Sequence, residues 1–183
     1  MQQMKVSFGG DAKDFPLGMS LLLFGSVGSG KTTFCLNLTK EFLSNKKPVV
    51  WVCLDSSPQS VRDQLNYFKV KVQEYETRGL LHYVDGYTSQ VSGTPPKDPS
   101  IVYCSSPVNL NELTLALKKV FDKISDKGIV VLDSISTLLL YTNRSVCEEF
   151  LKVHMNRVTS QGFTGFYILQ KDLHDKSVEE TVK

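Results

Sequence analysis

Short apolar runs alternate with longer stretches of helical periodicity along this chain. The apolar runs show little alternation with polar residues, which is typical of strands buried on both faces of a parallel sheet. An exposed antiparallel sheet would alternate instead. The pattern therefore predicts an α/β fold with three layers, a mostly parallel sheet flanked by helices. The five expected strands are 19–24, 49–54, 80–84, 129–132 and 165–169.

Capping residues mark the expected starts of three helices, and apolar side chains follow each start at helical spacing. The starts are Ser57 followed by Pro58, Asn109 with Glu112 three residues later, and Ser145 with Glu148 three residues later. The apolar positions are Val61, Leu65 and Phe68; Leu110, Leu113, Leu117, Val120, Phe121 and Ile124; and Val146, Phe150, Val153 and Met155. A fourth helix is expected after the strand 19–24. Together the four would cover both faces of the sheet.

Residues 86–107 differ from the rest of the chain, because Ser, Gly and Pro are frequent there. This composition predicts a long surface loop. Such a loop is either a solvated connection without a specific role or a place where a partner binds.

The 183 residues, 41% of them hydrophobic, are enough for one sizeable core and predict a single domain over residues 1–183. Lys and Arg number 21 against 19 acidic residues, and the net charge of +2 is spread along the chain. Nucleic acid is therefore not an expected partner.

Four cysteines lack C-x-x-C spacing and fit a reduced, cytoplasmic protein with free thiols. The N-terminal residues lack the apolar region of a secretory signal. No apolar run approaches the roughly 18 to 20 residues that would span a bilayer, so no membrane association is expected.

The strongest local pattern is G-x-x-x-x-G-K-[ST] at residues 25–32, directly after an expected strand and before an expected helix. Glycines let the backbone N–H groups approach phosphate oxygens, and the following helix adds its positive end to the same anion site. Lys31 is expected to reach the β and γ phosphates, and the Thr32 hydroxyl to coordinate Mg²⁺. The expected nucleotide-binding residues are Gly25, Ser26, Val27, Gly28, Ser29, Gly30, Lys31, Thr32 and Thr33.

A second pattern is the apolar strand 129–132 followed by Asp133. A carboxylate at the end of a strand beside the phosphate loop is the position from which an acidic residue holds the magnesium shell. Capping of the following turn is the alternative role for Asp133.

Three segments resemble the RecA superfamily and, within it, the KaiC-like ATPases. They are Phe15-Pro16-Leu17-Gly18 ahead of the first strand, Val52-Cys53-Leu54-Asp55-Ser56-Ser57-Pro58 at the end of the second, and Leu132-Asp133-Ser134-Ile135-Ser136 around the acidic strand end. The resemblance runs from about Phe15 to the C-terminus. It implies the RecA-like P-loop NTPase fold, with ATP and Mg²⁺ as the bound nucleotide and metal.

The resemblance also implies roles for two further residues. Asp55 stands where KaiC-like proteins carry a catalytic glutamate, and Ser56 where they carry its acidic neighbour, so the carboxylate is shorter. Capping of the following turn is the alternative role for Asp55. Gln170 stands where RecA relatives place a polar residue that senses the γ-phosphate, although polar residues are common at strand ends. The chain ends soon after the fifth expected strand, whereas relatives continue into further strands.

We therefore expect an ATP-binding domain that hydrolyses slowly, with Asp55, Lys31 and Gln170 in the catalytic role, and acts as a nucleotide-dependent switch or assembly module. It would act by self-assembly or by docking on another protein. The alternatives are a module that holds ATP without hydrolysing it and a recombinase acting on DNA, which only the superfamily suggests.

Overall fold

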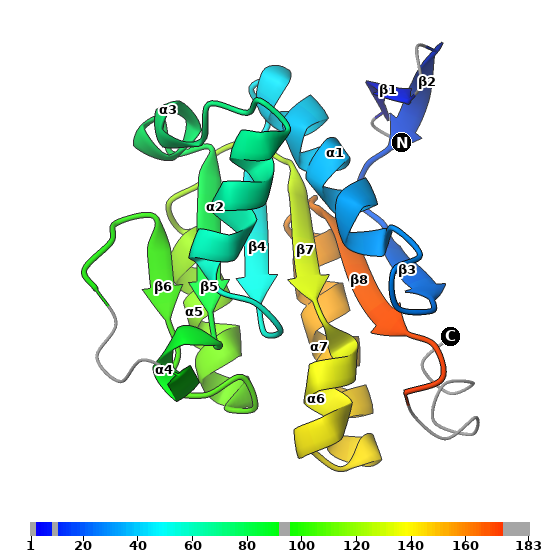
Figure 1. The fold of residues 1–183 in the computed structure, drawn as a ribbon, viewed down its shortest axis with the longest axis vertical. Coiled ribbons are helices and arrows are strands. Elements are labelled where there is room, and N and C mark those ends of the chain that lie inside the picture. The colour runs from blue at the N-terminus through cyan, green and yellow to red at the C-terminus, as the bar shows by residue number, and fades with distance from the viewer. Residues whose placement is uncertain (1–2, 9–10, 92–95, 174–183) are drawn as a thin grey trace.

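The computed structural model describes residues 3–8, 11–91 and 96–173, and its centre is a six-stranded, fully parallel sheet (Figure 1). The strands lie in the order β3-β8-β7-β4-β5-β6, each paired with its neighbours in parallel register. This confirms the predicted fold class. The strands are β3 (Ser20–Gly25), β4 (Val49–Cys53), β5 (Leu81–Asp85), β6 (Ile101–Tyr103), β7 (Ile129–Asp133) and β8 (Thr164–Gln170).

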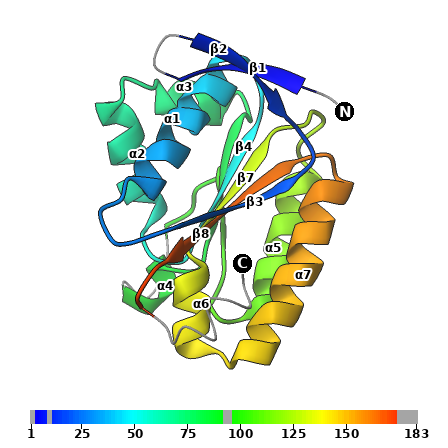
Figure 2. The same cartoon turned by 90° about the vertical axis from the view of Figure 1, so that its right-hand side faces the viewer.

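Helices cover both faces of the sheet, as Figure 2 shows. One face carries α1 (Lys31–Ser44), α2 (Pro58–Tyr67) and α3 (Val72–Thr77), and the other carries α5 (Leu110–Phe121) and α7 (Arg144–Ser160). Two short helices, α4 (Thr88–Val91) and α6 (Ile135–Tyr141), lie at the carboxyl end of the sheet. Each face has its own apolar cluster, because the strand residues alternate between the two.

Two elements were not predicted at the N-terminus. The strands β1 (Gln3–Phe8) and β2 (Asp11–Pro16) form an antiparallel hairpin, separate from the main sheet and at the end of the molecule away from α4 and α6. None of the helices within the described residues is long and apolar enough to cross a membrane.

The prediction of a long loop over residues 86–107 was wrong in part. The described part of this segment contains α4 and the strand β6, and residues 92–95 lie outside the described residues. β6 has only three residues, all half-buried, so it lacks the continuous apolar run that revealed the other strands. It is held by pairing with β5, and the Tyr83 amide donates to the carbonyl of Ser100 just before it.

Two of the three predicted helix starts are confirmed. The Ser57 hydroxyl accepts from the amide of Ser60 with Pro58 in the first turn, and the Asn109 side chain accepts from the amide of Glu112. The Glu112 carboxylate accepts from Ser105 instead of returning to Asn109, so that capping box is half formed.

The third predicted start, at Ser145, was wrong. The helix α7 begins at Arg144, and Asn143 caps it by accepting from the amide of Val146. The expected apolar stripe was also wrong in part, because Val146 and Val153 are exposed. The buried face follows the spacing of Cys147, Phe150, Leu151, His154 and Val158 instead.

Candidate functional site

The ends of four neighbouring strands bring the predicted site residues together. Parallel pairing places Gly25 opposite Gln170 on β3 and β8, and Cys53 opposite Asp133 on β4 and β7. A cavity of about 250 Å³ opens at this carboxyl edge of the sheet, where ligands bind in open α/β folds. Its lining residues are Val27, Gly28, Ser29, Gly30, Lys31, Thr32, Thr33, Asp55, Asp133, Ile168 and Gln170.

All the predicted site residues line this cavity except Gly25 and Ser26. These two line an adjoining open hollow beside β3, together with Lys31. Ile168 belongs to the cavity but was not predicted, because an apolar residue within a buried strand has no feature that separates it from the core.

Glycine geometry shapes the loop between β3 and α1. Gly28 and Gly30 have φ of 76° and 86°, in the left-handed region that disfavours side chains. A Cβ on Gly25 would lie 2.8 Å from the Ser29 hydroxyl oxygen, so the loop closes on itself there. The first residues of α1 line the cavity, and no side chain of the described residues caps this turn, so its backbone N–H groups are available there as an anion site.

Lys31 provides the positive charge of the site. Its Nζ donates to the carbonyl oxygens of Gly25 at 2.7 Å and Ser26 at 2.8 Å, and to the Ser29 hydroxyl at 3.3 Å. These neutral acceptors hold the ammonium group at the loop without neutralising it. The charge thus remains available to an anionic ligand.

Asp133 provides a buried carboxylate, with a residue exposure of 8%. Burial, and after it the charge of Asp55, raises the pKa of this carboxyl to about 6, although the Lys31 charge opposes the shift. A cation at this position would favour the ionised form, as expected for a residue that holds a metal shell. The Asp133 carbonyl accepts from the amides of Leu54 and Asp55, which fixes the end of β4 beside it.

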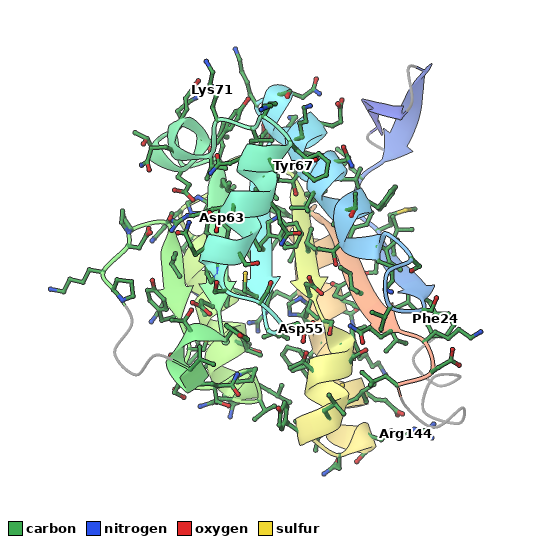
Figure 3. The ribbon with its side chains drawn as sticks, in the orientation of Figure 1. Phe24, Asp55, Asp63, Tyr67, Lys71 and Arg144 are labelled. Atoms are coloured by element: carbon green, nitrogen blue, oxygen red, sulfur yellow. The ribbon has the colours of Figure 1, made fainter. Side chains whose placement is uncertain are left out.

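Asp55 lies two residues after the end of β4, at the same edge of the sheet (Figure 3). Its Oδ1 accepts from the Thr137 hydroxyl at 3.3 Å, and that hydroxyl is 3.3 Å from the Ser134 hydroxyl. Ser57, rather than Asp55, caps α2. The contacts of Asp55 therefore point to the cavity and to α6.

The start of α6 supplies side chains to which sequence reasoning gave no role. Ser134 caps the helix by accepting from the amide of Thr137, and the Ser136 hydroxyl accepts from the amide of Gln170. The hydroxyl residues Ser134, Ser136 and Thr137, which directly follow Asp133, are the sequence feature that could have indicated this role. Through these contacts α6 joins Asp55 on one side of the cavity to Gln170 on the other.

A parallel sheet with a glycine-rich loop between β3 and α1, and an acidic residue at the end of β7, defines a P-loop nucleotide-binding domain of the RecA type. The family model described as "ATPase: KaiC" matches residues 8–182. The chain therefore belongs to the KaiC ATPase family.

Named relatives agree with this assignment. The UPF0273 protein PH0284 of Pyrococcus horikoshii is 27% identical over 157 residues, covering 85% of this chain and 62% of the relative. A UPF0273 protein of Aeropyrum pernix is 33% identical over 120 residues, covering 66% of this chain and 47% of the relative. The crystal structure of the KaiC-like protein PH0186 of Pyrococcus horikoshii superposes with a TM-score of 0.69 at 26% identity, covering 95% of this chain and 71% of that one. The chain thus spans about half to three-fifths of the length of these curated relatives.

The raised pKa of Asp133 leads to a stability prediction for the nucleotide-free protein. The folded-state pKa of Asp133 is near 6, above the ordinary value of 3.8. The free-energy cost of ionising this carboxyl in the folded protein therefore has its full value above pH 6 and is absent below about pH 4. Asp133→Asn should therefore raise the free energy of unfolding by roughly 1–3 kcal/mol at pH 7.5, and the gain should vanish near pH 4. Urea unfolding across this pH range measures it.

Asp126→Asn is the control for this prediction. A hydrogen bond from Lys47, followed by one from the Lys127 amide, lowers the pKa of the exposed Asp126 carboxyl. Its substitution should therefore give a change of opposite sign above its ordinary pKa. A gain for Asp133→Asn that is the same at every pH would show that charge is not its cause.

Proposed function

We propose that this domain binds ATP with Mg²⁺, hydrolyses it slowly, and uses the bound nucleotide as a switch for assembly or for docking on a partner. The observation that carries this proposal is that one cavity joins the phosphate loop with Lys31, Thr32, Asp55 and Asp133. Family membership supports ATP as the nucleotide.

The residues present fit a magnesium-bound nucleotide. The uncapped first turn of α1 and the glycine loop offer N–H donors to phosphate oxygens, and Lys31 adds a charged ammonium group. Thr32 and Asp133 would hold the metal, since magnesium takes a hydroxyl and one or two carboxylates in addition to phosphate oxygens. When bound, the metal neutralises charge on the phosphates.

Hydrolysis would depend on Asp55. A carboxylate that accepts a proton from the attacking water must lie within hydrogen-bond reach of it. Asp55 lies on the cavity wall, and its Oδ1 is oriented by the Thr137 hydroxyl. Its side chain is one bond shorter than that of glutamate, which favours slow turnover.

Gln170 would act in sensing rather than in bond breaking. It is the last residue of β8 and lines the cavity beside the phosphate loop, and its backbone amide donates to Ser136 on α6. A contact between this side chain and a terminal phosphate would therefore also act on α6, which carries the exposed Leu140 and Tyr141. This is a route by which the nucleotide state could reach the surface.

Two alternatives compete with this proposal. A module that holds ATP without hydrolysing it would use the same loop and would leave Asp55 without a kinetic role. A DNA recombinase is disfavoured, because the 21 basic and 19 acidic residues form no basic stripe. The balance of features favours a cytoplasmic protein whose partners are ATP and protein, either another copy of this chain or a different protein.

The experiment combines phosphate release with size measurement. The protein is incubated with ATP and Mg²⁺, and phosphate release and molar mass are followed together, against ADP and no nucleotide. The proposal expects slow, magnesium-dependent release and a mass or partner affinity that differs between ATP and ADP. Tight ATP binding with no release under single-turnover conditions would favour the non-hydrolysing module. No ATP binding would refute the proposal.

A further inference from the structure

A second cavity, of about 320 Å³, lies at the carboxyl edge of the sheet beside the first. The connection between β4 and α2 separates the two, with Asp55 lining the first cavity and Ser57 and Pro58 lining the second. The remaining walls come from the start of α2, the end of β5, α4 and β6 (Figure 1). Its size is within the range of small-ligand sites.

Asp85, the last residue of β5, lines this cavity and is fully buried, with an exposure of 0%. Its Oδ1 accepts from the amides of Tyr87 and Thr88, both at 2.9 Å. Its Oδ2 has no hydrogen-bond donor among the described residues. A buried carboxylate oxygen without a donor is costly, because burial removes the water that would otherwise solvate it.

Negative charge is in excess around this oxygen. Arg62 also lines the cavity, but its Nε pairs with Glu76 at 2.7 Å and its Nη2 with Asp98 at 2.7 Å. One guanidinium group thus serves two other carboxylates, and the described residues show no ion pair to Asp85. The cavity would therefore attract a cation.

The other walls of the cavity favour an organic cation over a metal ion. Tyr87 and Tyr103 line the cavity with Pro58 and Ile101, which gives flat aromatic and aliphatic surface next to the acidic groups. Burial, then the charges of Asp98 and Asp85, raises the pKa of the Tyr103 phenol, which remains neutral. Within the described residues, no three His, Cys, Asp or Glu side chains gather closely enough to hold a metal ion.

We propose that this second cavity binds an alkylguanidinium group, as carried by an arginine side chain or a small guanidine compound. The planar cation would donate to Oδ2 of Asp85 and lie against the tyrosine rings, since guanidinium groups stack on aromatic faces as well as donate to carboxylates. The alkyl stem would pack against Pro58 and Ile101. The site is distinct from the phosphate loop, so it does not depend on nucleotide binding.

The test uses N-acetyl-arginine-N-methylamide as the probe and its citrulline counterpart as a neutral ligand of the same shape. Binding to the whole chain is followed without nucleotide by NMR, through the amide signals of Tyr87 and Thr88. Saturable shifts are expected with the arginine probe, and an affinity weaker by about tenfold or more with the citrulline probe, because a charge-assisted hydrogen bond is lost. Butylguanidinium compared with an arginine-containing peptide then distinguishes a small ligand from a protein side chain.

Asp85→Asn is the matched protein variant. Asparagine keeps an oxygen for the two amides, but it removes the charge and places an NH₂ donor where Oδ2 was. The arginine probe should bind this variant about tenfold or more weakly, in a protein that still unfolds cooperatively. Asp63→Asn removes the same charge from the exposed side of α2, outside the cavity, and should bind the probe as the unmodified chain does.

Three outcomes would overturn the proposal. They are no saturable binding up to about 10 mM probe, equal affinities for the arginine and citrulline probes, and equal affinities for Asp85→Asn and the unmodified chain. The citrulline comparison is made on the unmodified protein, so it remains decisive if the variant fails to fold.

Discussion

Lys31→Ala is expected to weaken ATP binding by roughly a hundredfold or more, corresponding to about 3 kcal/mol. Lys31 is the charged side chain of the phosphate loop, and its acceptors in the nucleotide-free structure are neutral oxygens of Gly25, Ser26 and Ser29. Phosphate oxygens would replace these acceptors with charge-assisted partners, which alanine cannot provide. Titration calorimetry with ATP and Mg²⁺ measures the change.

The fold should survive this substitution. The carbonyls that Lys31 contacts lie near solvent, and water can replace the ammonium group there. Lys40→Ala removes the same charge from the exposed side of α1 and should leave ATP affinity unchanged. Undiminished affinity in a folded Lys31→Ala protein would remove the nucleotide assignment itself, whereas loss in both variants would indicate a nonspecific effect of charge.

The central part of the fold could be predicted because its signals are local. Fully buried strands such as β4 and β7 are continuous apolar runs, and their ends differ from the prediction by one residue. Ser57 and Asn109 indicate helix starts, because each cap side chain accepts a hydrogen bond from the amide three residues later in the sequence. β6 could not be found in this way, since its three residues are ordered by pairing with β5, a long-range contact.

The candidate site likewise has a part that local sequence predicts and a part that depends on long-range contacts. The phosphate loop and Asp133 are recognisable because a motif and a strand end fix their chemistry locally. The link from Asp55 through Thr137 to α6 depends on how the connections after β4 and β7 meet in space. Asp85 also follows an expected strand, but no phosphate-loop motif accompanies it, and its Oδ2 without a donor becomes evident only once the surroundings of β5 are known.

Asp55 is expected to set the rate of hydrolysis and to keep it low. Its side chain is shorter than glutamate by roughly 1.5 Å, and a misplacement of about 1 Å can cost on the order of a hundredfold in rate. Asp55→Glu should therefore speed single-turnover phosphate release by roughly ten- to a hundredfold. Asp55→Asn should lower whatever turnover exists.

ATP affinity should not fall in either variant, which separates a kinetic role for Asp55 from a binding role. The charge of Asp55 is one of the causes of the raised pKa of Asp133, so Asp55→Asn should favour the ionised form of Asp133, which is the form proposed to hold the metal. Asp63→Asn, which changes an exposed carboxylate on α2, is the control and should change neither rate nor affinity.

Equal release rates for the unmodified chain and both Asp55 variants would take Asp55 out of the mechanism. This chain would then be better explained as a module that holds ATP without hydrolysing it. The Thr137 contact to Asp55 would be a structural link between the residues after β4 and α6.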